Sequence, residues 1–385
     1  MKTNTHNVDV RVLAREHRYQ VLIGRDLLDQ VGRETRRALG PHPNRIALIS
    51  NQKIFKLYGD AVVRSLRRSQ FTVAHWLMGD GERIKSLSSL EKALQFLADA
   101  GLERSDAVVA LGGGVVGDLA GFAAATYLRG IPLIQVPTTV IAQIDSAIGG
   151  KTGVNLRTGK NLVGAFHQPR AVVVDVNTLK TLPARELVAG WCEAVKNGAV
   201  GDRDLFDSTV NFLKKLESAT SAVSAPALSG LIKSHCAFKA GVVNEDERED
   251  PERTDTRSRR ILNFGHTVGH ALEAATHYKR FRHGEAVGHG MVVAGEISKT
   301  LGLLPESELE SLTSAVRLCG PLPSAVEIDP DAIIKLIVSD KKSVRGKVQW
   351  VLLERIGRPR IVDGGKIPAR LLRDALRKGL KPALS

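Results

Sequence analysis

Histidines are concentrated in one part of the second half of the chain, and their spacing points to metal chemistry. His266 and His270 are one helical turn apart, so a helix presents both imidazoles on one face, as in a zinc-binding pair. Thr267 stands where the zinc-protease motif H-E-x-x-H has its glutamate, which excludes that class. His283 begins the next predicted helix and could fold back onto the pair. The remaining histidines of this region are typical of ordinary surface or core positions: His277 and His289.

Glu193 is a carboxylate in an otherwise apolar segment around Trp191 that has helical periodicity. A charge buried in a helix is costly unless a cation or hydrogen-bond donors surround it, so Glu193 requires a cation nearby. Spacing alone makes His266 and His270 the zinc pair, with His283 and Glu193 as further candidates.

A glycine-rich segment, 112–118, contains the pattern G-x-G-x-x-G between a strand-like run and a helical pattern. Glycines in this context let the backbone approach a pyrophosphate, which free N–H groups and the positive end of the helix stabilise. An ordinary Rossmann dehydrogenase has an acidic residue about 20 positions further on. The next acidic residue here is the more distant Asp145, so that class fits poorly. Taken alone, the glycines are also compatible with a tight turn that binds no ligand.

Two further polar clusters follow the glycine turn. Thr138 and Thr139 end the strand-like run 133–136, where open α/β sheets bind ligands, although either hydroxyl could simply cap the next helix. The segment 149–161 places lysines and amides among four glycines and is predicted to be a loop that surrounds an anion. A P-loop is not expected, because Asp145 stands where the first glycine of G-x-x-x-x-G-K-[ST] belongs.

Composition indicates a globular protein with two domains, since the chain has 385 residues of which 43% are hydrophobic and 25% charged. The 55 basic residues exceed the 41 acidic ones, which favours an anionic partner. Aromatic residues make up 4% and no DNA-binding motif occurs, so we expect a phosphorylated small molecule and no nucleic acid. No apolar run is long enough to span a bilayer and no signal peptide is recognisable, so we expect a cytoplasmic protein without a membrane partner. The cysteines lack metal-binding spacing and are expected to be buried thiols: Cys192, Cys236 and Cys319.

Short runs rich in Val and Ile alternate with helical patterns such as 87–100 in the first half of the chain, which predicts a parallel sheet. These strand-like runs are 46–50, 107–111, 133–136 and 171–174. After residue 185 helical periodicity dominates, in the segments 187–199, 228–243, 267–275 and 285–301. We therefore predict an α/β N-terminal domain with a Rossmann-like sheet, residues 1–181, and a mainly α-helical C-terminal domain, residues 182–385. Pro183 marks the boundary because it can open a helix after the last strand.

Taken together and in order, these motifs resemble the 3-dehydroquinate synthase family of the sugar-phosphate cyclases. The resemblance begins at a segment similar to the family's D-G-E-x-x-K, continues through 112–199 and ends near 340–353. Between these points lie N-F-G-H-T-V-G-H at 263–270 and H-G-E at 283–285. Several independent motifs in the same order make the resemblance specific.

The resemblance implies a lyase of the shikimate route to chorismate and the aromatic amino acids. Such an enzyme converts 3-deoxy-D-arabino-heptulosonate 7-phosphate to 3-dehydroquinate and phosphate. The conversion uses transient oxidation by NAD, phosphate elimination, re-reduction and an intramolecular aldol closure. It also implies a divalent metal, Zn2+ or Co2+, and a homodimer in which Arg129 reaches across the interface.

The resemblance also implies a role for individual residues. The metal ligands are Glu193, His266 and His283, so that His270 contacts the substrate phosphate or handles a proton. The residues implied to bind NAD are Asp80, Gly81, Glu82, Arg83, Ile84, Lys85, Gly114, Val115, Val116, Gly117, Asp118, Thr138, Thr139, Lys151, Lys160, Thr178, Leu179, Lys180 and Thr181. Those implied to act on the substrate are Asp145, Lys151, Asn161, Lys196, Lys239, Glu249, Arg259, Asn263, His270 and Lys341, with Lys342 as the alternative to Lys341.

One segment departs from the family pattern: residues 250–256 lengthen a loop that is normally short, and their charge predicts a solvated excursion. Counting back from Asn263 selects Arg259 as the substrate arginine, while Arg257 and Arg260 remain alternatives.

Two other enzyme classes stay open. One is a different sugar-phosphate cyclase, making valiolone-like or deoxy-inosose rings, and the other is a polyol oxidoreductase similar to glycerol dehydrogenase. Lys239, Asn263 and His270 together match the dehydroquinate synthase pattern and favour that function.

Overall fold

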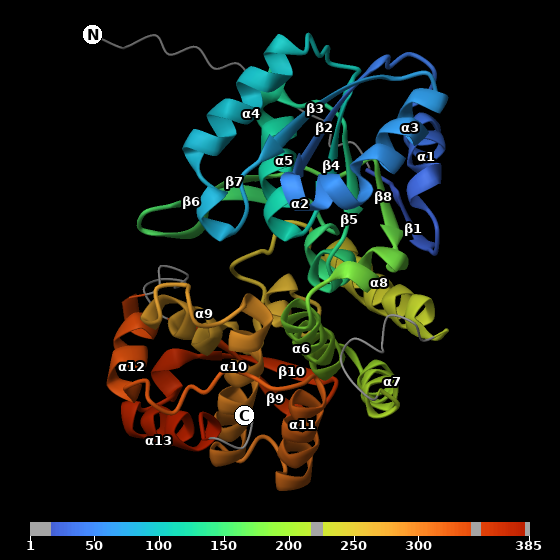
Figure 1. The fold of residues 1–385 in the computed structure, drawn as a ribbon. Helices are drawn as coiled ribbons and strands as arrows, with labels where there is room; N and C mark the ends of the chain where they lie inside the picture. The colour runs from blue at the N-terminus through green and yellow to red at the C-terminus, as the bar shows by residue number, and fades with distance from the viewer. Residues whose placement is uncertain (1–16, 217–225, 340–347, 382–385) are drawn as a thin grey trace, which may run out of the picture.

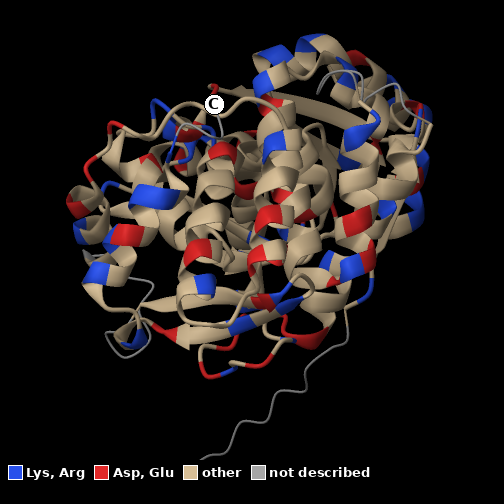
Figure 2. Ribbon diagram, turned by 90° about the horizontal axis from the view of Figure 1, so that it is seen from below, with Lys and Arg blue, Asp and Glu red and all other residues tan. Residues whose placement is uncertain are grey.

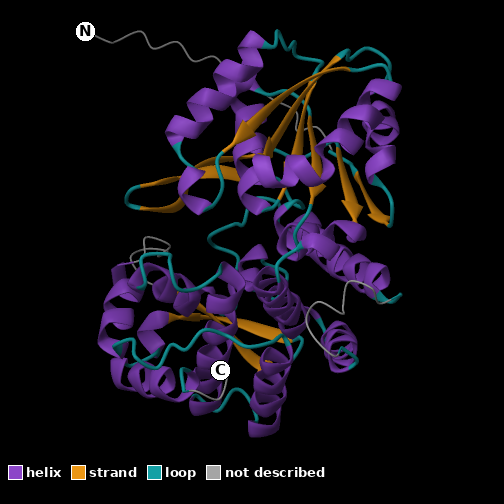
Figure 3. Ribbon diagram, in the orientation of Figure 1, coloured by secondary structure: helices purple, strands orange, loops and turns teal. Residues whose placement is uncertain are grey.

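The computed structural model describes residues 17–216, 226–339 and 348–381. The N-terminal half is built on a six-stranded parallel sheet, and the other half is mainly helical (Figure 1, Figure 3). The strands of the sheet follow the order β1-β8-β5-β4-β2-β3. Their bounds are β1 Gln20–Gly24, β2 Arg45–Asn51, β3 Thr72–Met78, β4 Ala107–Gly112, β5 Leu133–Pro137 and β8 Ala171–Asp175. This confirms the predicted fold class.

Helices cover both faces of the sheet, which explains why its central strands are apolar throughout. Leu48 of β2 packs in one cluster with residues of α1 and α3, while the next residue, Ile49, packs with α4 and α5. The bounds are α1 Val31–Leu39, α2 Gln52–Ile54, α3 Asp60–Arg68, α4 Leu87–Asp99 and α5 Gly114–Thr126. The carboxyl ends of the strands point toward the helical half (Figure 1). Ligands of open parallel sheets bind at this edge.

Segment 149–161 is not the loop that its glycines suggested. Most of it lies in an antiparallel hairpin of β6, Lys151–Leu156, and β7, Gly159–Phe166. Gly153 and Gly164 are paired in this hairpin, and a Cβ on Gly164 would lie 2.1 Å from the carbonyl oxygen of Thr152. At Gly153 and Gly164 glycine is needed for a close approach of the two strands, whereas Gly149 and Gly150 do turn the backbone, with φ of 92° and 66°. The loop prediction was therefore wrong for residues 151–156 and 159–161.

The C-terminal half surrounds two long buried helices, α6 and α10, and also contains a small hairpin of β9 and β10. Its helices are α6 Ala184–Gly201, α7 Arg203–Lys214, α8 Leu228–Glu245, α9 His266–Ala275, α10 His283–Thr300, α11 Glu306–Leu318, α12 Pro330–Ser339 and α13 Ala369–Gly379. The hairpin strands are β9 Gln349–Arg355 and β10 Arg358–Asp363. In α6 every residue from 187 to 200 is buried, so the helix is enclosed on all sides.

Shorter 3-10 and π-helical segments provide several of the candidate site residues. Those of the N-terminal half are η1 Leu28–Gln30, η2 Phe55–Gly59, η3 Glu82–Ile84, η4 Tyr127–Arg129, η5 Ala142–Ser146 and η6 Val176–Thr181. The C-terminal half has η8 Arg259–Asn263 and η9 Gly364–Lys366. Pro183 precedes α6, as predicted, while the division into domains at residues 181 and 182 stays a prediction.

Glycines let α10 approach its neighbours closely. A Cβ on Gly284 would lie 1.9 Å from the carbonyl oxygen of Ala189 in α6. A Cβ on Gly290 would lie equally close, at 1.9 Å, to the carbonyl oxygen of Gly265, directly before α9. These contacts fix the start of α10, and therefore His283, against the helix that carries Glu193.

All three cysteines are buried free thiols, as expected. Among the described residues, no helix has both the length and the apolar character needed to cross a bilayer. Basic and acidic segments are interspersed on the face seen in Figure 2.

We predict that Gly284→Ala destabilises the protein by about 1–3 kcal/mol, because its methyl group would overlap the backbone of α6. Gly230→Ala is the matched control: it lies in α8 with no atom within 4 Å of the added Cβ, so it should stabilise the protein slightly. Urea denaturation of both variants measures the difference. Equal stability of Gly284→Ala and the wild type would contradict the packing described.

Candidate active site

A cavity of about 610 Å³ lies between the two halves of the chain. Its N-terminal wall is the β6–β7 hairpin with Asp118 of α5, and its C-terminal wall comes from η8, α9 and the β9–β10 hairpin. Candidate site residues that line the cavity are Asp118, Lys151, Asn161, Glu249, Arg260, Asn263, His266 and His270. Pro251, from the inserted loop, lines it as well, whereas most of the insert is exposed as predicted.

The carboxylate of Glu193 is fully buried beside the cavity, and among the described residues its Oε1 has no hydrogen-bond partner. The ammonium nitrogen of Lys196 lies 2.8 Å from Oε2 and partly balances its charge. Nε2 of His266 lies 3.8 Å and Nε2 of His283 3.6 Å from Oε1. Ligands of one tetrahedral zinc ion lie roughly 3.3–3.5 Å apart, given metal–ligand bonds of about 2.0–2.1 Å. The chemistry and spacing of these donors therefore fit a divalent cation.

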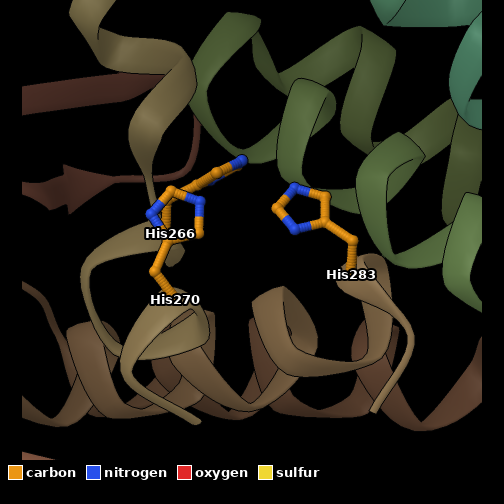
Figure 4. Close-up of side chains that lie close together, drawn as sticks. All are labelled: His266, His270 and His283. Carbon is orange, nitrogen blue, oxygen red and sulfur yellow. The ribbon is translucent and has the colours of Figure 1, made fainter. Parts of the chain in front are cut away.

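Three imidazoles converge at this place. Ligand nitrogens of His266, His270 and His283 all lie within 4.8 Å of one another, and the rings come from α9 and α10 (Figure 4). The ring centroids of His266 and His270 are 5.4 Å apart, which is the proximity that their spacing predicted. Glu193 lies beside the rings of His266 and His283. The geometry therefore accommodates either of two ligand sets: Glu193 with these two histidines, or the three histidines together.

Glu273 is a buried residue of this region that the sequence reasoning missed. Its carboxylate accepts a hydrogen bond from Nδ1 of His283, at 3.1 Å, and another from the ammonium of Lys160, at 2.9 Å. Burial would raise the pKa of Glu273, but these two partners outweigh it and lower the pKa to about 2. Glu273 follows His266 and His270 at positions i+7 and i+3, so helical spacing was the signal that could have found it.

Asp145 lies between two lysines at the base of the cleft. It belongs to the π-helix η5 and contacts the ammonium groups of Lys196 and Lys239, the first at 3.2 Å. Burial alone would raise the pKa of Asp145, but the two ammonium groups hold it well below its usual range. Burial lowers the pKa of Lys239 to about 8, although Asp145 opposes the shift. For Lys196 the carboxylates outweigh burial, and the pKa is raised.

A second polar cluster brings residues of both halves together. The ammonium of Lys151, at the start of β6, contacts Glu249, whose other oxygen accepts a hydrogen bond of 2.9 Å from Asn263. The side chain of Asn161 accepts a hydrogen bond from Lys85, which also pairs with Asp118 of α5. The candidate residues for the substrate and for the nucleotide therefore share the wall formed by the β6–β7 hairpin.

The glycine turn after β4 leads directly into an uncapped helix N-terminus, a feature that can bind an anion. Helix α5 begins at Gly114, and no side chain caps its N-terminus. Cβ atoms on Gly113 and Gly114 would lie 3.0 and 3.1 Å from side-chain atoms of Thr139 and Ser146, so the turn packs closely on the loop after β5. The hydroxyl of Thr138 is buried there without a hydrogen-bond partner, which fits a missing ligand.

The other residues expected to bind NAD lie along the same edge of the sheet. Asp80 follows β3 and pairs with Lys53 at 2.7 Å. The hydroxyl of Thr139 accepts from the backbone N–H of Ala142, so it does cap the following segment. Thr178 donates to the carbonyl oxygen of Asp175 and has a structural partner already. Residues 82–84 form η3 and residues 176–181 form η6.

The structure separates the three alternative arginines. Arg259 is buried, and its guanidinium donates to the carbonyl oxygen of Glu247. Arg260 lines the cavity and donates to the carbonyl oxygen of Pro251, while Arg257 is exposed. Which of them contacts the substrate stays a prediction. Lys341 and Lys342 lie outside the described residues.

Comparison with known proteins decides the family. Residues 75–189 match the model of the 3-dehydroquinate synthase N-terminal region, and residues 190–343 match that of its C-terminal region. The 3-dehydroquinate synthase of Nostoc punctiforme is 43% identical over 365 residues, which cover 94% of this chain and 96% of the relative. The 3-dehydroquinate synthase of Symbiobacterium thermophilum is 47% identical, and the match covers 89% of this chain and 93% of the relative. The chain belongs to the 3-dehydroquinate synthase family.

Solved structures of related cyclases have the same fold as this member of the 3-dehydroquinate synthase family. A 2-epi-5-epi-valiolone synthase from Streptomyces hygroscopicus, with NAD+ and Zn2+ bound, has a TM-score of 0.83 and 27% identity, covering 96% of this chain and 99% of its own. A 2-deoxy-scyllo-inosose synthase in complex with carbaglucose-6-phosphate, NAD+ and Co2+ has a TM-score of 0.79 and 28% identity, covering 94% and 96%. A glycerol dehydrogenase from Schizosaccharomyces pombe shares the fold alone. Its TM-score is 0.67 and its identity 15%, and the match covers 96% of this chain and 92% of the dehydrogenase.

For this 3-dehydroquinate synthase family member we predict that kcat/KM falls as pH rises through about 8, because the buried Lys239 loses its proton there. A neutral amine neither attracts an anionic substrate nor stabilises charge that develops on it, so the loss should appear both as a higher KM and as a lower kcat. Lys239→Arg keeps its charge and should move the falling limb of the pH profile upward. Lys239→Ala should lower kcat/KM on the order of 100-fold or more. A Lys239→Arg profile that coincides with the wild type would contradict this assignment.

Proposed function

We propose that this protein is a 3-dehydroquinate synthase that converts 3-deoxy-D-arabino-heptulosonate 7-phosphate to 3-dehydroquinate and phosphate. One observation carries the proposal: the same cavity is lined by Asp118, at the end of the glycine segment, and by His266 and His270. The identity of 43% to a 3-dehydroquinate synthase over nearly the whole chain supports the same reaction. Nucleotide, metal and substrate groups would then meet in one cleft, as the chemistry requires.

Glu193, His266 and His283 would hold the divalent cation, Zn2+ or Co2+. The buried carboxylate supports this set: Lys196 compensates Oε2, whereas Oε1, which has no hydrogen-bond partner among the described residues, faces His266 and His283 and would gain from a cation there. NAD would lie along the carboxyl edge of the sheet, with its pyrophosphate at Gly114 to Asp118 and further contacts from residues 80–85, 138–139 and 178–181. Bound NAD would accept and return a hydride at the C5 carbinol, and the cation would polarise the oxygen at that carbon.

The side chains of the cavity suit a substrate with a phosphate and a carboxylate. Lys151, Asn161 and Asn263 project from both walls and can hold the anionic groups by charge and hydrogen bonds. Lys196 and Lys239 are positioned by Asp145 and would stabilise the negative charge that develops when the proton beside the oxidised carbon is removed. His270 lies next to the metal-binding residues and can carry a proton to or from the leaving phosphate.

We also propose that the N-terminal half, residues 1–181, binds NAD and that residues 182–385 bind the metal and most of the substrate. The homodimer and the cytoplasmic location are part of the proposal. In the dimer, Arg129 would complete the partner's site. Leu128 and Arg129 both have positive φ angles, 48° and 66°, which are rare for residues other than glycine. Such strained backbone is often found at functional sites, which supports a role for Arg129.

One assay distinguishes this function from its rivals. The purified protein, given the heptulosonate phosphate, should release phosphate without net NADH. Phosphate release from a hexose 6-phosphate, with none from the heptulosonate, would instead indicate another cyclase. Sustained NADH formation with glycerol, and no phosphate release, would indicate a polyol oxidoreductase.

We predict that a chelator abolishes phosphate release and that zinc or cobalt restores it. Glu193→Gln should bind zinc at least 100-fold more weakly than the wild type, on the order expected when a ligand's charge is lost. The control Asp207→Ala removes a half-exposed carboxylate that pairs with Arg203 and should leave both activity and zinc affinity unchanged. Isothermal titration with zinc measures the affinity. Full metal-dependent activity of Glu193→Gln would refute the proposed ligand set.

A further inference from the structure

Glu273 occupies the space between a proposed metal ligand and the nucleotide-binding half of the chain. The residue is buried in α9, and its two oxygens have different partners. Oε2 lies 3.1 Å from Nδ1 of His283, and Oε1 accepts a hydrogen bond of 2.9 Å from Lys160. Each oxygen therefore connects the carboxylate to a different element.

The contact with His283 determines how that ring faces the metal centre. An ionised carboxylate only accepts hydrogen bonds, so in the neutral imidazole the proton is on Nδ1. The lone pair is then on Nε2, the atom that lies 3.6 Å from Glu193. A carboxylate behind a ligating histidine fixes both the tautomer and the orientation of the ring.

The contact with Lys160 comes from the other side of the cleft. Lys160 lies in β7, within the hairpin whose residues Asn161 and Phe166 line the cavity. Its ammonium is also 4.6 Å from the ring centroid of Tyr278, a residue that follows α9. Lys160 is thus held by two groups of the C-terminal half, although it belongs to the N-terminal half.

We propose that Glu273 is a positioning residue for His283, and that Lys160, acting through Glu273, couples metal affinity to the position of the β6–β7 hairpin. This inference rests on the proposed function, since it takes His283 as a metal ligand. A purely structural ion pair between the halves would leave metal affinity independent of both residues. The two interpretations therefore predict different zinc affinities for variants of Glu273 and Lys160.

Zinc affinity of the full-length, substrate-free protein is the test, measured by competition with a chromogenic chelator. Glu273→Ala should weaken zinc binding about 10–100-fold, the range typical of such partners of metal-bound histidines. Glu273→Gln keeps an acceptor for Nδ1 but loses the charge, so its loss should be smaller. Lys160→Met should also weaken binding, but less than Glu273→Ala.

A double mutant tests whether Lys160 acts through Glu273. If it does, adding Lys160→Met to Glu273→Ala should cause no further loss of zinc affinity, because the connecting group is already absent. Additive losses in the double mutant, or an unchanged affinity in Lys160→Met alone, would overturn the coupling. Lys299→Met is the matched control, since it removes a partly exposed lysine that pairs with Glu296 and Glu306, and should not change zinc affinity.

Further measurements keep the test independent of folding and of the proposed reaction. Visible absorption of the Co2+-loaded protein should change in Glu273→Gln, because the ligand geometry changes, while circular dichroism of the metal-free protein should not. If the wild type binds no zinc, the metal site of the proposed function fails. If the wild type binds zinc and Glu273→Ala binds it equally well, only the present inference fails.

Discussion

Ion pairs across the cleft are the interactions on which the rest of the site depends. Asp145 pairs with Lys196 and Lys239, Lys160 pairs with Glu273, and Lys151 pairs with Glu249, and each pair joins the two halves of the chain. The charges of Asp145, Lys196 and Lys239 are largely buried, and such charges cost several kcal/mol to desolvate unless an opposite charge compensates them. The pairs therefore join the two halves, and one of them holds Lys151 at the wall of the cavity. An anionic substrate entering the cleft would have to compete with carboxylates that already contact those lysines.

Helix packing supplies the precision that the ion pairs cannot. The proposed metal ligands come from three helices, α6, α9 and α10, which approach closely where Gly284 and Gly290 replace larger side chains. Because a protein interior is densely packed, the start of α10 has little freedom to move relative to α6. Glu193 can thus be kept as a buried carboxylate beside two imidazoles, an arrangement that would be unfavourable without a cation.

Much of the fold could be predicted from local pattern. The four Val- and Ile-rich runs became β2, β4, β5 and β8, and the long periodic segments became α6, α8, α9 and α10. The strands that were missed have weaker signals: β1 and β3 lie at the edges of the sheet, and β9 and β10 have polar or charged residues at their ends. The β6–β7 hairpin was taken for a loop because glycine signals a turn and a close strand contact equally well.

The sequence by itself determined the kinds of element, the family, and the residue types available for metal, nucleotide and phosphate chemistry. Periodicity and motif spacing act over a few residues, so they survive without knowledge of the fold. Only the tertiary structure decided that Lys160 contacts Glu273, that Arg259 is buried while Arg260 lines the cavity, and that Glu193 is fully buried beside two imidazoles. These facts depend on burial and on partners far apart in the chain, such as Lys160 and Glu273. Such groups meet only when the sheet and the helices pack against each other.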